Sequence, residues 1–268
     1  MPIPKCIHFF WGQGVDEIPS KYHTYIDSWK FHNKDWTIRI WSDELFRNEP
    51  NIKEWHPQMY KRYLRMNHPA FQKDIMSLYI LDRYGGFMLD MDCVCLQPIQ
   101  NCVELETANV LTSQLVCASK ISNVFFKSTR DLYCIASPKG HPLWAAICTY
   151  ICREAPDYQN TVLPFSKDKF FLSTVADKMP SNVSFFANET SCVRFKTHIT
   201  NATFCLHECH GSWLNSNQIY PNIVSCIRDN SNLDIYALVL FMVIIASITI
   251  KLYSRRRNNS GIRSIIKN

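Results

Sequence analysis

The most regular pattern of apolar and polar positions in this chain lies in residues 70–98. Apolar residues dominate positions 75–81, and Pro69 stands where the first residue of a helix would be, so the pattern predicts a helix here. A glycine pair follows at residues 85–86. We expect the helix to end at this pair, because glycine adopts the left-handed conformation without a Cβ penalty. The short apolar run at residues 87–89 then predicts a buried strand.

Two carboxylates, Asp90 and Asp92, end this predicted strand. Side chains alternate between the faces of a strand, so residues two apart point the same way and these acids should lie together. Two like charges side by side at a buried position cost free energy unless a positive charge lies between them. Carboxylate oxygens suit Mg²⁺ and Mn²⁺. The pattern therefore predicts a divalent metal site that uses both acids.

Strands and helices alternate along the first half of the chain. The apolar, β-branched and aromatic runs predict strands at residues 3–11, 37–41, 109–116, 125–126, 132–136, 183–186 and 193–195. The helical patterns predict helices at residues 20–31, 55–66, 143–153 and 168–179. This alternation predicts an α/β fold. The first strand is followed by a glycine-containing loop, the kind of position where open α/β sheets bind their ligands. His8, on that strand, is interpreted as structural.

The net charge of +6 comes from a short tail. The chain has 29 Lys and Arg residues and 23 Asp and Glu residues, and six of the basic residues but no acid lie beyond residue 250. Residues 1–250 therefore balance 23 basic residues with 23 acids. A nucleic-acid groove needs a basic field in the folded part of the protein. The charge pattern argues against a nucleic-acid partner, and so against a nuclease built on the acid pair.

An uncharged apolar run at residues 235–250 precedes the basic tail. Together with residues 251–253 it reaches 19 residues, close to the roughly 20 that cross a bilayer. The following arginine triplet at residues 255–257 favours a membrane span over a buried helix. We therefore predict four parts, which are a domain at 1–220, a linker at 221–234, a transmembrane helix at 235–253 and a basic tail at 254–268.

The side of the membrane is argued from two features that disagree. Asn182, Asn188 and Asn201 each begin a glycosylation triplet, and the basic tail favours a cytosolic C-terminus. Residues 1–30 show no signal-peptide pattern, which instead favours a tail anchor with a cytosolic domain. We expect a lumenal domain in an endomembrane compartment of the Golgi or endoplasmic reticulum.

The chain has 12 cysteines, and none of them forms a Cys-x-x-Cys pair. The tightest pairs are at residues 93 and 95, 148 and 152, and 205 and 209. Structural zinc sites usually show tighter paired spacing together with histidines, so the spacing argues against zinc. Disulfides in a lumenal compartment remain an open alternative.

Several motifs occur in a characteristic order. They are IPKCIHFFW from residue 3, NKDWTIRIW from residue 33, KDIMSLYILDRYGGFMLDMD from residue 73, ISNVFF from residue 121, GHP from residue 140 and HGSW from residue 210. In this order the chain resembles the DXD-containing sugar transferases of glycosyltransferase family 32, which include yeast-type α-mannosyltransferases and inositolphosphoceramide mannosyltransferases. The resemblance spans residues 3–214. Its most specific part is Asp, ten residues, Gly-Gly, three residues, then Asp-x-Asp.

The resemblance implies a GT-A fold that transfers a hexose from a nucleotide sugar with retention, using Mn²⁺ or Mg²⁺. Asp92 matches the acid that binds the metal directly. Asp90 matches the acid that contacts the donor sugar or ribose and, through water, the metal. Asp74 matches a helix acid that binds the sugar hydroxyls, and Trp11 matches the ring that packs on the nucleobase.

The C-terminal motif implies a loop that closes over the diphosphate. His207, Ser212 and Trp213 match this loop, in which the family supplies a further metal ligand and an indole contact to phosphate. His207 is the expected ligand, and Glu208 and His210 are alternates in the same loop. Asn123 and His141 recur in the family pattern and are given supporting roles.

Two positions depart from the family pattern. Ser77 stands at a position where the family usually has an arginine that faces the donor. Lys73 and Arg83 are candidates to replace the charge of that arginine. Met88 stands at a position where the family usually has a tyrosine.

We favour a membrane-anchored enzyme that transfers mannose from GDP-mannose to a lipid or glycan acceptor, with UDP-hexoses as rival donors. The departures keep an alternative open, a non-catalytic membrane-tethered sugar-binding protein with the same fold.

Overall fold

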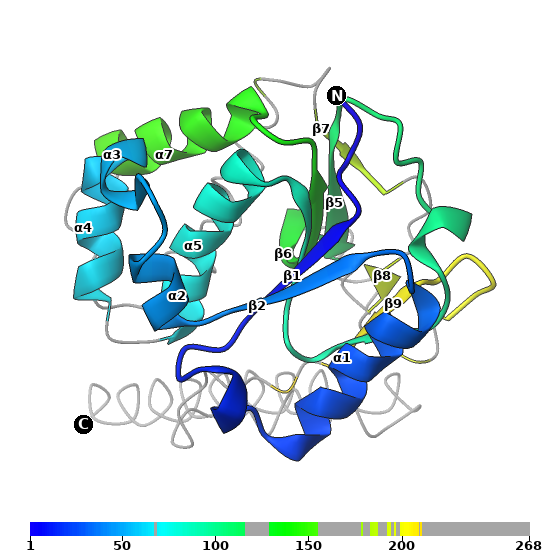
Figure 1. Cartoon of the computed structure of the whole chain (residues 1–268). Helices are drawn as coiled ribbons and strands as arrows, with labels where there is room; N and C mark the ends of the chain where they lie inside the picture. The colour runs from blue at the N-terminus through cyan, green and yellow to red at the C-terminus, as the bar shows by residue number, and fades with distance from the viewer. Residues whose placement is uncertain are drawn as a thin grey trace, which may run out of the picture. The chain divides into compact units, whose positions relative to one another are not determined.

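A mixed six-stranded sheet is the framework of the described part of the chain (Figure 1). Its order is β2-β1-β3-β6-β5-β7, with bounds β1 (Cys6–Phe10), β2 (Thr37–Trp41), β3 (Gly86–Leu89), β5 (Val110–Leu115), β6 (Thr129–Ser137) and β7 (Val183–Phe185). Strand β1 runs parallel to β2 and β3, whereas β6 runs antiparallel to β3 and β5. A second sheet has the order β4-β9-β8, from β4 (Cys93–Cys95), β8 (Cys192–Val193) and β9 (Cys205–His207).

The computed structural model describes residues 1–66, 69–115, 129–154, 183–186, 192–193 and 199–208, together with Lys178, Lys196 and His210. All of them belong to a unit that comprises residues 1–213. The predicted strand at 125–126, the predicted helix at 168–179 apart from Lys178, the linker, the transmembrane helix and the tail lie outside the described residues. No helix within the described residues is long and apolar enough to cross a bilayer.

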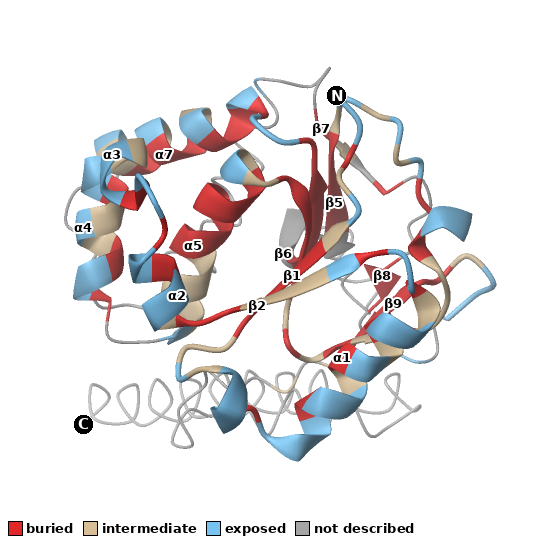
Figure 2. Cartoon of the chain, in the orientation of Figure 1, coloured by how far each residue is buried: buried red, intermediate tan, exposed pale blue. Residues whose placement is uncertain are grey.

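The helices divide between the two faces of the large sheet (Figure 1). Their bounds are α1 (Ser20–His32), α2 (Asp43–Arg47), α3 (Ile52–Trp55), α4 (Pro57–Arg65), α5 (Pro69–Arg83) and α7 (Pro142–Glu154), with 3₁₀ turns η1 (Val15–Glu17) and η2 (Ile99–Asn101). Met88 and Phe10 pack in a core with α4, α5 and α7, whereas Phe87 and Phe9 pack in a core with α1. Strands β1 and β3 are therefore covered on both faces, which explains their continuous apolar runs (Figure 2).

Local patterns predicted the type of these elements, with one helix corrected. The predicted helix at residues 55–66 is α4, which begins at Pro57, and Trp55 is instead the last residue of the separate helix α3. The break is at His56, which has φ −155° and ψ 89°. The residue before a proline is disfavoured in the helical region, and Pro57 instead begins α4 as its first residue.

The glycine pair after α5 does more than end the helix. Gly85 and Gly86 have φ values of 66° and 87°, as the predicted stop requires. A Cβ on Gly86 would lie 2.4 Å from the carbonyl oxygen of Cys6 on β1, and a Cβ on Gly85 would lie 2.6 Å from the backbone nitrogen of Lys139. The glycine pair therefore lets β3 begin directly beside β1. The start of β3 in turn determines where its carboxyl end lies.

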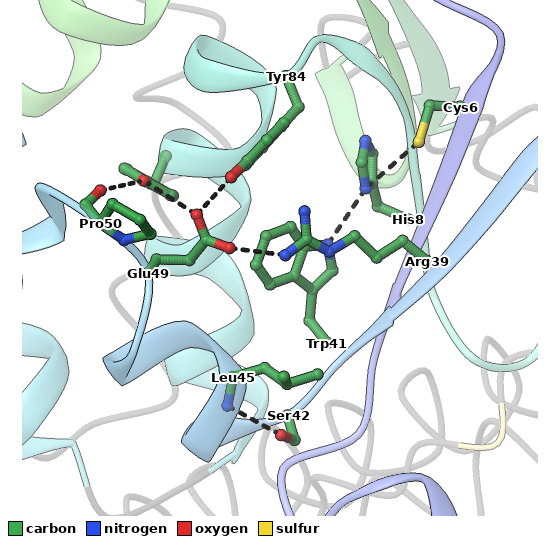
Figure 3. A network of polar contacts seen from close by, with 10 residues as sticks. Cys6, His8, Arg39, Trp41, Ser42, Leu45, Glu49, Pro50 and Tyr84 are labelled. Atoms are coloured by element: carbon green, nitrogen blue, oxygen red, sulfur yellow. Dashed lines mark hydrogen bonds and ion pairs between the residues drawn. The ribbon is translucent and has the colours of Figure 1, made fainter.

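His8 has the structural role expected of it. The Trp41 indole Nε1–H donates to His8 Nδ1 at 3.1 Å (Figure 3). His8 Nε2 therefore carries the proton and donates to the Gly85 carbonyl oxygen at 3.0 Å. Burial lowers the pKa of His8 to about 4, although the Gly85 contact opposes this shift, and nearby Arg39 lowers it further. The neutral imidazole thus ties β1 to β2 and to the glycine turn.

A buried carboxylate extends this network to the end of α5 (Figure 3). Arg39 Nη2 lies 2.6 Å from Glu49 Oε1, and the Arg39 guanidinium lies 3.7 Å from the centroid of the Trp41 ring. The Tyr84 hydroxyl donates to the other oxygen of Glu49. Glu49 is therefore paired and hydrogen-bonded, as a buried charge must be, and β2 is fixed to the C-terminal end of α5.

We predict that Gly86→Ala destabilises the protein by about 1–3 kcal/mol more than Gly140→Ala does, because the new Cβ would overlap the backbone of β1. Gly140 is a matched control, since it also has a positive φ, 68°, but a Cβ there would meet nothing within 4 Å. The measurement is the free energy of unfolding in denaturant. Equal losses for the two variants would show that the close approach of β3 to β1 is unimportant.

Candidate active site

Asp90, Asp92 and His207 meet beyond the carboxyl end of β3. Asp90 follows β3, Asp92 precedes β4, and His207 is the last residue of β9. In the antiparallel pair of β4 and β9, Cys93 lies opposite His207, which brings the end of β9 beside the two acids. One oxygen or nitrogen atom from each of the three residues lies within 4.8 Å of the others. The predicted convergence of the acids and His207 is therefore present.

The route to this convergence differs from the expected one. The acids do not lie on a strand, because β3 ends at Leu89 and the Cys93 amide donates to the Asp90 carbonyl oxygen at 3.1 Å, which closes a turn. His207 does not lie in a loop but in β9. The turn, rather than the alternation of a strand, brings the two carboxylates together.

Asp92 is held by contacts to both its carboxylate oxygens. His207 Nε2 lies 3.0 Å from Asp92 Oδ1 and 3.5 Å from Asp90 Oδ2. The backbone amide of His210 donates to Asp92 Oδ2 at 2.7 Å. Burial alone would raise the pKa of Asp92, but the hydrogen bond and charge of His207, together with the His210 amide, outweigh it and lower the pKa below its ordinary value. Asp92 is therefore ionised at neutral pH.

Lys73 is the basic partner of Asp90. Its Nζ forms an ion pair with Asp90 Oδ1, and its side chain is 12% exposed. Burial alone would lower the pKa of Lys73, but the charges of Asp90 and Asp74 raise it above its ordinary value. Ser77, one helical turn further along α5, donates its hydroxyl to the Lys73 carbonyl oxygen at 2.7 Å. Helix α5 thus presents a cation to the acid pair from position 73.

Tyr133 fixes the ring of His207. The two rings are stacked with centroids 4.5 Å apart and an interplanar angle of 8°. The Tyr133 hydroxyl donates to the Cys192 carbonyl oxygen at 2.9 Å. Sequence reasoning did not find Tyr133, because a tyrosine within an apolar strand has the pattern of a core residue.

A row of aromatic rings extends from the site along α1. Trp11, just beyond β1, lies 5.4 Å from Tyr22 between ring centroids. The ring of His210 lies 5.7 Å from that of Tyr22 and 5.8 Å from that of Tyr25. His210 therefore faces α1 with its ring while its amide holds Asp92. This row connects the expected nucleobase ring to the acid pair.

The remaining predicted site residues have separate positions. Glu208 lies 3.6 Å from Lys196 in an ion pair. His141 accepts the Leu143 amide at 3.2 Å through Nδ1, at the start of α7. Asn123, Ser212 and Trp213 lie outside the described residues. Met88 is buried in the core against α5.

The donor set formed by Asp90, Asp92 and His207 fits a divalent cation. Carboxylates suit Mg²⁺ and Mn²⁺, and an imidazole nitrogen is accepted by transition metals. Such cations take about six ligands in an octahedral arrangement. Three protein donors therefore leave coordination positions for phosphate oxygens and water.

Comparisons with known proteins match part of this chain to glycosyltransferases. Residues 19–111, from α1 into β5, match the family described as a glycosyltransferase sugar-binding region containing a DXD motif. The chain is 26% identical over 182 residues to an uncharacterized glycosyltransferase of Acanthamoeba polyphaga mimivirus, over 67% of each chain. It is 31% identical over 93 residues to inositol phosphoceramide mannosyltransferase 3 of Schizosaccharomyces pombe, which is 35% of this chain and 25% of that protein. The match thus spans a quarter of the yeast relative.

A solved structure shows the same fold. The PaToxG glycosyltransferase aligns with a TM-score of 0.52 at 16% identity, over 67% of this chain and 71% of that chain. The expected α/β fold is confirmed, as a mixed sheet with helices on both faces. The Asp90–Asp92 turn lies inside the matched segment. Residues 19–111, which include this turn, are therefore similar to the sugar-binding region of the glycosyltransferases that contain a DXD motif.

Proposed function

We propose that this protein is a metal-dependent hexosyltransferase that transfers mannose from GDP-mannose to a lipid or glycan acceptor with retention. The observation that carries the proposal is the convergence of Asp90, Asp92 and His207 beside Lys73. The name of the Schizosaccharomyces pombe relative supports mannose as the sugar and an inositol-containing sphingolipid as the acceptor. UDP-hexoses are the rival donors.

The metal would be Mn²⁺ or Mg²⁺, held by Asp90, Asp92 and His207. When bound, such a cation stabilises the negative charge that develops on the departing nucleoside diphosphate. The lowered pKa of Asp92 keeps this ligand ionised. The stack on Tyr133 holds the His207 ring, so that Nε2 faces both carboxylates. The protein thus supplies a preorganised, negatively charged donor set.

Lys73 supplies a second positive charge at the leaving group in this proposal. It is buried beside Asp90 and carries a raised pKa, so it stays protonated at neutral pH. It lies one turn before Ser77, the position at which the resembling family carries arginine. A diphosphate bound at the acid pair would therefore meet both the metal and an ammonium group from α5.

The donor's other parts are assigned to residues around this centre. Asp74 is partly exposed and adjacent to Lys73, where it can accept hydrogen bonds from sugar hydroxyls. Trp11 is partly exposed beyond β1, and its indole is suited to pack on the nucleobase. Ser212 and Trp213 are proposed to contact the diphosphate.

We predict that Asp92→Asn and His207→Ala each lower donor turnover by roughly 100-fold or more, because removal of a ligand weakens the metal that stabilises the leaving group. The assay measures nucleotide released by the full-length protein from GDP-mannose and UDP-hexoses with Mn²⁺, and after chelation. Asp35→Asn is the control, since Asp35 is an exposed acid paired with Lys5 away from the site. Turnover that resists both chelation and Asp92→Asn would refute metal dependence.

Lys73→Met should lower kcat by about 100-fold, the size of effect seen when one group that stabilises developing negative charge is removed. Lys73→Arg should restore a part of the activity, because it keeps the positive charge. Lys53→Met is a control at an exposed lysine of α3. If Lys73→Met and Lys53→Met have the same kcat, then Lys73 has no role at the leaving group.

We further propose that residues 235–253 anchor the protein in an endomembrane of the Golgi or endoplasmic reticulum, with the enzyme domain in the lumen. The uncharged run and the basic tail support this proposal.

The protein should stay in the membrane pellet after alkaline extraction, and deletion of residues 235–268 should release it. Treatment with a glycosidase should increase the gel mobility of the protein, and this increase should be smaller for the Asn201→Gln variant than for the unchanged protein. An unmodified protein in the pellet would place the domain on the cytosolic side.

A further inference from the structure

Four cysteines that lie far apart in the sequence meet in the interior behind the acid pair. They come from four strands, Cys93 in β4, Cys134 in β6, Cys192 in β8 and Cys205 in β9. The sulfur atoms of Cys134, Cys192 and Cys205 all lie within 4.8 Å of one another. Cys93 is hydrogen-bonded to Cys205. All four residues are buried, with at most 4% exposed.

We propose that these four cysteines bind one structural Zn²⁺, as a closed thiolate site distinct from the site of Asp90, Asp92 and His207. A zinc–sulfur bond of about 2.3 Å places the sulfurs of a tetrahedral site about 3.8 Å apart. Three of the sulfurs are already within 4.8 Å of one another. These three sulfurs would each approach by up to about 1 Å, and rotation of the Cys93 side chain would bring in the fourth sulfur. Thiolates are also the ligands that select zinc over Mg²⁺ and Mn²⁺.

Strand pairing assembles this cluster, which explains why the spacing of the cysteines argued against zinc. Cys192 lies opposite Cys205 in the parallel pair of β8 and β9, and Cys93 lies two positions from the residue opposite Cys205 on β4. That residue, Cys95, is engaged elsewhere, since its sulfur accepts the Asn33 amide at 3.4 Å and donates to the Gln97 carbonyl oxygen at 3.3 Å. The fourth ligand is therefore Cys93 rather than Cys95.

Two simpler explanations account for less of the arrangement. A buried cysteine often packs as a small apolar side chain, but that explains single thiols rather than four thiols gathered from four strands. A disulfide requires one pair of sulfurs about 2.05 Å apart, whereas Cys93, Cys134, Cys192 and Cys205 are all free thiols in the structure. A shared cation uses all of them.

The backbone around Cys93 tolerates loss of its thiol proton. Cys93 Sγ donates to the Tyr133 carbonyl oxygen at 3.5 Å, and that oxygen also accepts the Asp90 amide at 3.0 Å. When Cys93 becomes a thiolate ligand, the carbonyl therefore keeps a hydrogen bond. Metal binding at this position leaves no buried acceptor without a partner.

A zinc ion bound by these cysteines would stabilise the strands that carry the active-site residues. Cys93 follows Asp92, and Cys205 lies two residues before His207. Tyr133, which stacks on His207, precedes Cys134 and bonds the carbonyl of Cys192. One ion would link all four strands that position these groups. The zinc proposal does not depend on the transferase activity, because it concerns binding by cysteines alone.

Cobalt substitution of the full-length protein tests the proposal. Co²⁺ bound by thiolates gives an intense near-ultraviolet charge-transfer band, whereas Co²⁺ bound by the carboxylates and imidazole of Asp90, Asp92 and His207 does not. We expect about one thiolate-bound Co²⁺ per chain, displaced by Zn²⁺, as for a single closed site. Cys192→Ser and Cys205→Ser should lose most of the band. Cys148→Ser, an equally buried cysteine of α7, should keep it, and so should Asp92→Asn.

A second measurement needs no variant and so does not depend on whether a serine variant folds. Zinc in the purified protein should protect the four cysteines from alkylation, mapped by mass spectrometry, and a chelator should expose them. Two results would overturn the proposal. One is a native protein that binds no zinc and gives no thiolate–cobalt band. The other is a disulfide, found by peptide mapping without reductant, that joins two of the four cysteines.

Discussion

The repulsion between two carboxylates held at the end of a buried strand is the constraint on which the rest of this site depends. Asp90 and Asp92 lie in one tight turn, where neighbouring negative charges require compensation. Lys73 from α5 and His207 from β9 both face them. A protein that keeps such a turn must supply positive charge, and Lys73 provides one such charge here.

The position of this turn depends on close packing farther back in the sheet. Gly86 lets β3 approach β1, and His8 bridges from β1 to Gly85 and Trp41. Arg39 in the same layer is paired with Glu49 and lies over the ring of Trp41. The framework that places the acids is therefore specified by contacts that lie away from the chemistry. Loss of a framework contact would affect the site through geometry rather than through a missing functional group.

Two positive charges of different chemistry are proposed at the active site, and a third is proposed in the interior behind it. The acids and His207 favour a metal that can exchange with the substrate, because their donors are oxygen and imidazole nitrogen. Lys73 contributes a positive charge that belongs to the protein itself and does not exchange as a bound metal ion does. The cysteine cluster behind β4 would hold a third cation that the substrate never meets. Division of roles between an open site and a closed site is the pattern seen for catalytic and structural metals.

The sequence by itself determined the features that depend on local pattern and residue chemistry. These are α5, its glycine stop, the buried strand β3 and the acids that follow it, because hydrophobic period, glycine conformation and carboxylate charge are properties of neighbouring residues. Only the tertiary structure decided that the acids occupy a turn, that Lys73 pairs with Asp90, that Tyr133 holds His207 and that Cys93, Cys134, Cys192 and Cys205 gather. These contacts depend on the pairing of β6 with β3, on the pairing of β9 with β4 and β8, and on the packing of α5, all between segments far apart in the sequence. A local hydrophobic period does not specify which distant segments will meet.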